Sequence, residues 1–321
     1  MNSLPELMKA FGDRFKTFRF PESPANLYQP NDYFLSLGGK RIRPVLCLLG
    51  NQLFGTLSED AFNTAAAIEL FHNFSLIHDD IMDKADLRRG KETVHKRYGA
   101  NTAILSGDVM LIRAYELLAT INPEKLPAIL TLFNQTAREV CEGQQLDMDF
   151  ETRTTVALDE YMHMIGLKTS VLIAASLEMG AILNNASVED RKHLYEFGLN
   201  LGIAFQIQDD YLDAFGDPEK FGKTVGGDIK QNKKTFLLIF ALEHAIGDDL
   251  IKLQELLNTD NEDKVASVLA IYKSCKADLW TKELIEKYRS SAMESLATVK
   301  ITDEFKKPLY ELAEYLIQRE F

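Results

Sequence analysis

Two short stretches of the sequence place several carboxylates on segments that are otherwise apolar. The first is "FHNFSLIHDDIMDKADLRRG" at 71–90 and the second is "FQIQDDYLD" at 205–213. In both, the outer aspartates of an Asp-Asp-x-x-Asp pattern are four residues apart, which is one helical turn on the same face. Like charges about 4 Å apart repel by roughly 4 kcal/mol at an effective dielectric constant of 20. A cation must therefore neutralise each cluster.

Mg²⁺ suits such oxygen ligands, because it keeps several waters and is usually completed by phosphate groups of a substrate. A solvated helix end with an ordinary charge run is the alternative for either cluster taken alone. Two copies, each at the end of an apolar helix, favour the metal site. The candidate metal ligands are Asp79, Asp80 and Asp83 in the first cluster and Asp209, Asp210 and Asp213 in the second.

Basic residues near these clusters indicate an anionic ligand. The stretch "GGKRIRP" at 38–44 places Lys40, Arg41 and Arg43 directly before a predicted helix, where backbone N–H groups also favour anions. His72 lies two turns before the first cluster. Its imidazole is placed either to bind a phosphate or to form a hydrogen bond in the core. Taken singly, each cation is also compatible with a solvated surface. The remaining candidates are Arg88, Arg89, Lys168, Lys223 and Lys233.

Hydrophobic periodicity predicts an all-helical chain. Apolar residues recur at spacings of three and four almost everywhere after residue 44, and runs of alternating β-branched residues are absent. No linker rich in Pro, Ser or Gly is long enough to separate two domains, so we expect one domain over 1–321. The predicted helices are 2–18, 44–54, 59–84, 100–121, 124–150, 157–184, 188–215, 233–246, 248–258, 262–274, 277–299 and 302–319.

Composition excludes several classes of protein. The net charge of −12 argues against a nucleic-acid partner, because phosphate backbones are bound mainly through a surplus of Lys and Arg. The three cysteines are odd in number and widely spaced, so neither a disulfide framework nor a zinc site is indicated. No apolar run approaches the roughly 18 residues of a membrane span. We therefore expect a cytoplasmic protein without stable membrane insertion.

The motifs together resemble those of the trans-isoprenyl diphosphate synthases, also called polyprenyl synthetases. The resemblance runs from about residue 36 to the end. It rests on "GGKRIRP", "DDIMD", "LRRG", "GQQLD" at 143–147, "KT" at 168–169, "FQIQDD", "DDYLD" and "GK" at 222–223. It implies an all-helical bundle around one deep central cavity, of the isoprenoid synthase type, usually as a homodimer that uses about three Mg²⁺ ions. The end "LIQREF" departs from the basic tail of many relatives, because it offers only Arg319.

The resemblance also implies substrates and roles. The substrates would be isopentenyl diphosphate and an allylic diphosphate, namely dimethylallyl, geranyl or farnesyl diphosphate. The six aspartates would hold the metal ions from opposite walls of the cavity. Lys40, Arg43, His72 and Arg89 would bind isopentenyl diphosphate. The residues that would hold the allylic diphosphate or shield its charge are Arg88, Lys168, Thr169, Gln206, Lys223 and Lys233.

The expected reaction is a head-to-tail condensation in which the allylic diphosphate ionises, the double bond of isopentenyl diphosphate adds to the cation, and a proton is lost. The length of the product should depend on the cavity floor. Phe74 lies five residues and Ser75 four residues before Asp79, about one turn nearer that floor. A ring at 74 obstructs the growing chain whereas the small Ser75 does not. We expect a C20 product, with C15 as the alternative and ordinary core packing as the other reading of Phe74.

Three other functions compete with this interpretation. A metal phosphohydrolase could begin its site with the His78–Asp79 pair, but none of the six histidines forms a second close pair with an acid. A terpene cyclase shares the fold but usually carries an Asn/Ser/Glu-type second metal motif. A non-catalytic partner subunit would lack one acid cluster. The sequence favours the synthase, because both clusters are complete and Lys40 with Arg43 provide for a second diphosphate.

Overall fold

A computed structural model describes residues 2–216, 226–259 and 262–317, and these form two compact units. Unit 1 contains residues 1–134, 175–192 and 300–308, and unit 2 contains 135–174, 193–299 and 309–321. Nearly all regular structure is helical, so the predicted all-α class is confirmed. The single domain and its central cavity stay predictions.

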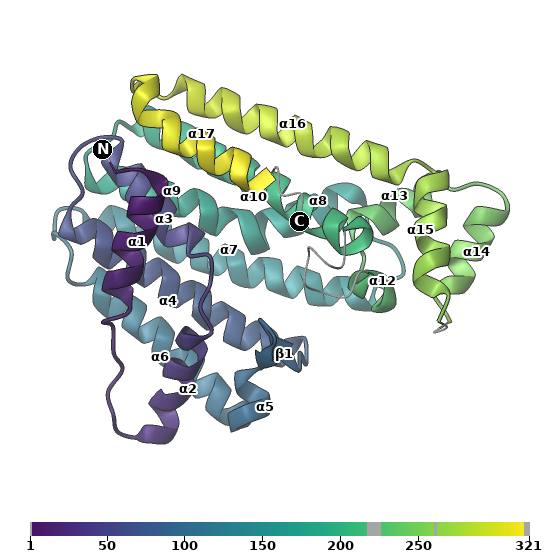
Figure 1. Cartoon of the computed structure of the whole chain (residues 1–321), viewed down its shortest axis with the longest axis horizontal. Helices are drawn as coiled ribbons and strands as arrows, with labels where there is room; N and C mark the ends of the chain where they lie inside the picture. The colour runs from purple at the N-terminus through teal and green to yellow at the C-terminus, as the bar shows by residue number, and fades with distance from the viewer. Residues whose placement is uncertain (1, 217–225, 260–261, 318–321) are drawn as a thin grey trace. The chain divides into compact units, whose positions relative to one another are not determined.

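The helices of unit 1 come mainly from the first third of the chain (Figure 1). Four helices have residues in both units, namely α7 (Leu126–Thr152), α9 (Val171–Leu183), α10 (Val188–Phe215) and α17 (Asp303–Ile317). The elements that lie wholly within unit 1 are α1 (Leu4–Phe15), α2 (Ala25–Ser36), α3 (Ile42–Gln52), α4 (Glu59–Met82), β1 (Leu87–Arg88), β2 (Lys91–Glu92), α5 (Val94–Tyr98) and α6 (Ala100–Leu118).

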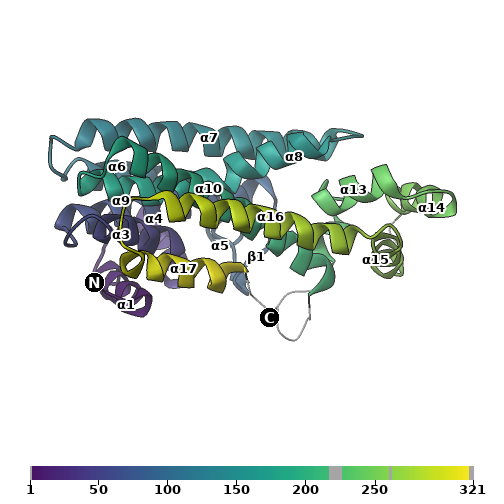
Figure 2. The same ribbon diagram turned by 90° about the horizontal axis from the view of Figure 1, so that it is seen from above.

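Unit 2 is built from helices later in the chain. Figures 1 and 2 both show three helices grouped beside the N-terminal end of α16 (Ala277–Thr298), namely α13 (Phe236–His244), α14 (Asp248–Leu256) and α15 (Lys264–Ser274). The elements within this unit are α8 (Leu158–Ile165), the π-helical turn η1 (Gly166–Ser170), α12 (Gly227–Lys230), α13 (Phe236–His244), α14 (Asp248–Leu256), α15 (Lys264–Ser274) and α16 (Ala277–Thr298).

Helix α4 is the central element of unit 1. Its N-cap Ser58 accepts a hydrogen bond from the Ala61 amide at 3.1 Å, which satisfies one of the four unpaired N–H groups at a helix start. The helix then packs against α3 and α6, and its apolar residues are buried on several faces, as predicted for a helix without a polar side. It carries the first acid cluster where it ends.

Two glycines bring α3 and α9 into backbone contact in unit 1. A Cβ atom on Gly50 would lie 2.2 Å from the Leu177 carbonyl oxygen, and one on Gly180 would lie 2.0 Å from that of Cys47. Asn51 Nδ2 donates to the Gly180 carbonyl at 3.1 Å across the same contact. The small residues thus allow α3, which begins at the basic 38–44 stretch, to pack directly on a second buried helix.

Several short elements were not predicted from periodicity. Helix α2 lies in a segment with three prolines, one of which, Pro30, is inside the helix. The hairpin of β1 and β2 has only two residues in each strand, too few to show an alternating pattern. Its turn residues Arg89 and Gly90 have φ values of 53° and 73°, as a two-residue type I′ turn requires. The five-residue α5 and the four-residue α12 were also missed.

The run Leu158–Leu183 corrects the expectation about apolar segments. It is 26 residues long with a hydropathy of 1.4 in its most apolar window, so by length and composition alone it could cross a membrane. However, 72% of that window is buried within the protein. This burial is that of a core helix in a globular fold.

The close approach of α3 and α9 makes Gly180 sensitive to substitution. We expect Gly180→Ala to lower the free energy of unfolding by about 1–3 kcal/mol, because the added methyl group overlaps the Cys47 carbonyl. Gly12→Ala is the matched control, since nothing lies within 4 Å of its Cβ position in α1. It should stabilise by about 0.5–1 kcal/mol. Urea denaturation of both variants measures the difference, and equal midpoints would contradict the close packing.

Candidate active site

The hairpin after α4 carries Arg88 to one carboxylate of the first acid cluster. Arg88 Nε donates to both carboxylate oxygens of Asp80, at 2.9 and 2.8 Å, and its Nη2 lies 2.8 Å from Asp80 Oδ1. Asp80 is only 1% exposed. Acids at a helix C-terminus oppose the helix dipole, so this charge-assisted pair offsets that cost. Asp80 therefore points into the protein, where it holds Arg88.

Asp79 and Asp83 have different surroundings from Asp80. The Asp83 amide donates to the Asp79 carbonyl at 2.8 Å, so both residues lie on the last turn of α4. Asp79 is partly buried and Asp83 is exposed. Because a helix rotates by about 100° per residue, Asp80 is turned away from the face that its two neighbours share. Asp79 and Asp83 present the cluster's accessible carboxylates.

Arg89, at the tip of the hairpin, contacts the 38–41 loop. Its guanidinium donates to the Gly38 carbonyl oxygen. A Cβ atom on Gly39 would lie 3.1 Å from that guanidinium, which explains the small residue there. Burial lowers the pKa of Arg89, with Arg41 and Arg88 adding like-charge repulsion. The second glycine of "GGKRIRP", Gly39, thus leaves space for the Arg89 guanidinium as well as allowing the backbone to turn.

His72 is surrounded by guanidinium groups. Arg43 Nη1 lies 3.2 Å from His72 Nε2. The pKa of His72 is held well below its ordinary value, first by burial and then by Arg43 and the other three arginines nearby. The imidazole is consequently neutral, and one of its nitrogens can accept a hydrogen bond. The four arginines are Arg41, Arg43, Arg88 and Arg89.

Lys40 lies beside these residues on the 38–41 loop. It lines a cavity of about 640 Å³ that is bounded by α1, α2 and the loop itself. The cations of unit 1 that the sequence predicts lie in or next to two segments, the start of α3 and the β1–β2 hairpin. Unit 1 brings Arg43, Arg88 and Arg89 together near His72, with Asp80 paired to Arg88, whereas Lys40 lines the cavity beside α1 and α2.

Phe74 and Ser75 occupy the same helix, one turn before Asp79. The Phe74 ring lies 5.6 Å from that of Phe71 and 4.8 Å from that of His78, between ring centroids. Ser75 Oγ donates to the His72 carbonyl at 2.9 Å. His78 Nε2 lies 3.0 Å from the Ile104 carbonyl of α6, so this imidazole links two helices. Phe74 is half-buried and is held in place by aromatic neighbours.

In unit 2, the π-helical turn η1 carries Lys168 and Thr169. Lys168 Nζ forms an ion pair with Asp147 Oδ2 at 2.5 Å. A Cβ atom on Gly143 would lie 2.3 Å from the Lys168 amide nitrogen, so the glycine of "GQQLD" allows α7 to approach this turn closely. Single π turns within helices are frequent at functional sites. The predicted helix 157–184 contains this turn, which periodicity did not reveal.

The second acid cluster lies beside these residues in unit 2. Thr169 Oγ1 donates to Gln206 Oε1 at 3.1 Å, and Gln206 Nε2 donates to Asp210 Oδ1 at 2.9 Å. The Tyr161 hydroxyl donates to the other oxygen of Asp210. Burial, together with repulsion from Asp228, raises the pKa of Asp210 to about 8. These side chains line a pocket of about 110 Å³ within the unit.

Asp213 and Lys233 are joined through Asp228. The Asp228 amide donates to Asp213 Oδ2 at 3.0 Å, and Lys233 Nζ lies 3.6 Å from Asp228 Oδ1. Sequence reasoning missed Asp228 and Tyr161 and treated Asp147 only as part of a motif. The one signal available was the position of Asp228 in the "GGDIK" segment just after the second cluster. Asp209 is partly buried on the same helix end.

Two of the predicted basic residues and the metal ions are not part of the described structure. Lys223 and Arg319 lie outside the described residues. Among residues 2–216, 226–259 and 262–317, no three or more His, Cys, Asp or Glu side chains are close enough together to hold a metal ion. The donor chemistry nevertheless fits Mg²⁺. Carboxylates recur at a four-residue spacing at the ends of α4 and α10, and burial with repulsion from Asp228 disfavours the charged form of Asp210, which a nearby cation would favour.

Comparison with known proteins identifies the family. The sequence profile of polyprenyl synthetase matches residues 24–275. A geranylgeranyl diphosphate synthase from Methanosarcina mazei is 38% identical over 300 residues, which cover 93% of this chain and 91% of the relative. A geranylfarnesyl diphosphate synthase from Natronomonas pharaonis is 34% identical over 319 residues, which cover 94% and 92%.

The fold agrees with this assignment. A crystal structure of a geranylgeranyl pyrophosphate synthase superposes with a TM-score of 0.95 at 45% identity, covering 100% of both chains. The resemblance inferred from the aspartate-rich and basic motifs is therefore confirmed. This chain belongs to the polyprenyl synthetase family of prenyltransferases.

Proposed function

We propose that this protein condenses isopentenyl diphosphate head-to-tail with an allylic diphosphate and releases a short-chain all-trans prenyl diphosphate. The observation that carries the proposal is the arrangement around His72, where four guanidiniums and a neutral imidazole surround one position on α4. Glu69 pairs with Arg41 and Asp80 with Arg88, so this group of six charged side chains is net positive. Such a site attracts a diphosphate.

A second diphosphate site is proposed in unit 2, around Lys168. Its ion pair with Asp147, the adjacent Thr169 and the pocket with Lys233 provide donors beside carboxylates. Under this proposal Arg43, His72, Arg89 and Lys40 bind isopentenyl diphosphate, and Lys168, Thr169, Gln206 and Lys233 serve the allylic substrate. Arg88 would also serve the allylic diphosphate, with its guanidinium oriented by Asp80.

Mg²⁺ is the cofactor that we propose, about three ions in number. Asp79 and Asp83 would hold it together with Asp209 and Asp213, which requires the two clusters to share one site. When bound, the metal neutralises the diphosphate leaving group of the allylic substrate. Asp80 and Asp210 would not contact the metal ions directly but would orient neighbouring side chains, because each is buried and hydrogen-bonded to protein groups.

The chain's own residues would act mainly through charge and position. Lys168 would stabilise the negative charge that develops on the leaving diphosphate as the allylic carbon–oxygen bond breaks. Arg43, Arg89 and neutral His72 would hold isopentenyl diphosphate so that its double bond meets the allylic carbon. The proton lost at the end would pass to the departing diphosphate, since the carboxylates are committed to cations. Apolar side chains of α4 would exclude water from the cation.

We propose a C20 product, with C15 as the alternative. Phe74 is fixed between Phe71 and His78, so its ring is suited to limit chain growth one turn below Asp79. The geranylgeranyl relative favours C20, and the geranylfarnesyl relative adds a longer product as a possible outcome. The cyclase and phosphohydrolase interpretations lose support, because the family is that of polyprenyl synthetases and His78 contacts the Ile104 carbonyl.

Homodimerisation and a cytoplasmic location without membrane insertion are further proposals. Four large apolar side chains of α6 are more than a third exposed in the single chain, which supports a partner surface there. They are Ile104, Leu105, Ile112 and Tyr115. Sedimentation velocity of the purified chain tests the dimer, and a single monomeric species would end that proposal.

The assay that tests the function is incubation with Mg²⁺, labelled isopentenyl diphosphate and each allylic starter. We expect Arg43→Met to raise the KM for isopentenyl diphosphate by roughly 10–100-fold, because a charged hydrogen bond contributes about 1.5–3 kcal/mol. The kcat and the KM for the allylic substrate should change little. Arg97→Met is the control, since Arg97 is exposed and stacks on Tyr33 at 4.4 Å. Wild-type protein that forms no prenyl product would refute the function.

Metal binding tests whether the two clusters share one site. Mn²⁺ titrated in the presence of inorganic diphosphate should bind the wild type, and Asp79→Asn and Asp209→Asn should each weaken binding roughly tenfold or more, since each removes a charged oxygen ligand. Asp60→Asn, in the first turn of the same helix as Asp79, should bind normally. Unaltered Mn²⁺ stoichiometry and affinity in either cluster variant would exclude a shared site.

Product length tests the role of Phe74. Phe74→Ala should lengthen the product by at least one isoprene unit, because the ring no longer blocks the chain, and Ser75→Phe should shorten it. Phe62→Ala is the control, as Phe62 is another partly buried ring of α4, stacked under Arg14. Chromatography of the dephosphorylated products measures the length. The same distribution from wild type and Phe74→Ala would leave Phe74 with a packing role only.

A further inference from the structure

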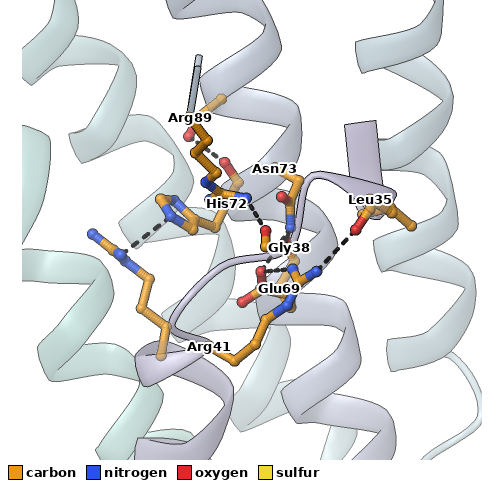
Figure 3. A network of polar contacts seen from close by, with 9 residues as sticks. Leu35, Gly38, Arg41, Glu69, His72, Asn73 and Arg89 are labelled. Atoms are coloured by element: carbon orange, nitrogen blue, oxygen red, sulfur yellow. Dashed lines mark hydrogen bonds and ion pairs between the residues drawn. The ribbon is translucent and has the colours of Figure 1, made fainter. Parts of the chain in front are cut away.

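Glu69 is a buried carboxylate of α4 that the proposed reaction does not use. It is 3% exposed and forms an ion pair with Arg41. Asn73, one turn further along α4 and fully buried, donates through Nδ2 to Glu69 Oε1 at 2.8 Å and to the Glu69 carbonyl at 2.6 Å. Figure 3 shows Glu69 and Asn73 on one face of the helix, with Arg41 reaching up to them. The carboxylate is therefore held in one orientation.

The partner of Glu69 has an unusual backbone conformation. Arg41 has φ 53° and ψ 35°, in the left-handed region, and it is the N-cap of α3. A residue other than glycine stays in this region only where the surrounding structure holds it. Three contacts hold the Arg41 side chain. Besides its ion pair with Glu69, it donates to the Leu35 carbonyl at 3.3 Å, and its guanidinium lies 5.0 Å from the centroid of the Phe15 ring. The ion pair thus anchors the backbone between Lys40 and Arg43.

The other end of the 38–41 loop is also tied to a charged group. Arg89 donates to the Gly38 carbonyl, and its guanidinium packs closely over Gly39. In Figure 3, Gly38 lies between the Arg89 guanidinium and the Glu69–Arg41 pair. The loop is consequently held at both ends, and a shift of Arg41 would move Lys40 and the hydrogen bond that orients Arg89.

We infer that Glu69 is a positioning residue, which acts through Arg41 to hold the 38–41 loop and the cations Lys40, Arg43 and Arg89 in the arrangement that binds a diphosphate. The inference rests on the proposed function in one respect, which is that the bound diphosphate group is that of isopentenyl diphosphate. It assigns Arg41 to the scaffold rather than to the substrate. Glu69 itself would repel the substrate if it were not neutralised by Arg41.

The first test is Glu69→Gln in the full-length protein. This change removes the charge and keeps an oxygen that accepts from Asn73. We expect the KM for isopentenyl diphosphate to rise roughly tenfold, with kcat and the allylic KM within about twofold, because the loss is one of ground-state positioning. Hydrogen exchange at the amides of 39–41 should become faster, whether or not substrate is present.

A double variant separates positioning from stability. Replacing both partners of a buried ion pair by apolar groups often leaves the fold intact, so Glu69→Leu with Arg41→Met should fold without an unpaired charge. It should nevertheless keep the raised KM and the fast exchange, since the loop anchor is gone. Ile68→Ala is the destabilised control, because Ile68 is fully buried beside Glu69 on α4 but outside the ion pair. Its KM and loop exchange should match those of the wild type.

The outcomes are distinct. A wild-type KM and wild-type loop exchange in the double variant would overturn the inference, as would a KM in Ile68→Ala that rises as much as in Glu69→Gln. If the wild type makes no prenyl product, the proposed function fails, and exchange at 39–41 together with calorimetric binding of inorganic diphosphate still decides the inference. Faster exchange and weaker diphosphate binding in Glu69→Gln would support it, and unchanged values would overturn it.

Discussion

A concentrated charge inside a protein needs an opposite charge within hydrogen-bonding distance, and this constraint arranges both units. In unit 1 the guanidiniums near His72 are interleaved with Glu69 and Asp80, each of which is almost fully buried and paired with one arginine. In unit 2 the buried Asp210 has hydrogen bonds from Tyr161 and Gln206 but no ion-pair partner among the described residues, and burial together with repulsion from Asp228 raises its pKa. The group around His72 thus has more arginines than carboxylates, whereas Asp210 has no ion-pair partner among the residues that the structure describes.

The apolar scaffold makes these charges effective. Burial reduces screening by water, so each ion pair and each dipole acts more strongly than it would on the surface. Buried groups also move little, because the helices that carry them are closely packed at sites such as Gly50 and Gly180. The same glycines that allow α3 to pack on α9 therefore help to keep the basic start of α3 in place. A scaffold that holds charges before the substrate arrives reduces the reorganisation required during the reaction.

Much of the fold and most of the candidate residues were predictable from the sequence. The helices α4 and α10 have long apolar patterns, and the acid clusters at their ends follow from local spacing. The β1–β2 hairpin could not be found by periodicity, because its strands are two residues long and its turn places an arginine in the left-handed region. The contact of Tyr161 with Asp210 joins residues 49 positions apart, which no local pattern encodes.

The sequence also could not distinguish equivalent residues within one motif. Asp79, Asp80 and Asp83 are the same residue type in one motif, yet only Asp80 is buried in an ion pair with Arg88 of the hairpin. Arg41 and Arg43 are likewise two positions apart in a single basic stretch, but they contact different residues of α4. Glu69 and His72 are three residues apart and so face the same side of the helix. The anionic Glu69 takes Arg41 into an internal ion pair, whereas the neutral His72 meets Arg43 without cancelling its charge.

This sorting has a physical reason. A guanidinium that binds a substrate anion must keep its positive charge and its donors oriented toward the ligand, which a buried carboxylate partner would prevent. A guanidinium that fixes a loop needs the opposite, a permanent anionic partner of low exposure. The lowered pKa of His72 is part of the same arrangement, because a protonated imidazole beside Arg43 would add repulsion at the site and lose its acceptor nitrogen. One face of α4 thus gives Arg41 a buried carboxylate as its partner and places a neutral imidazole beside Arg43.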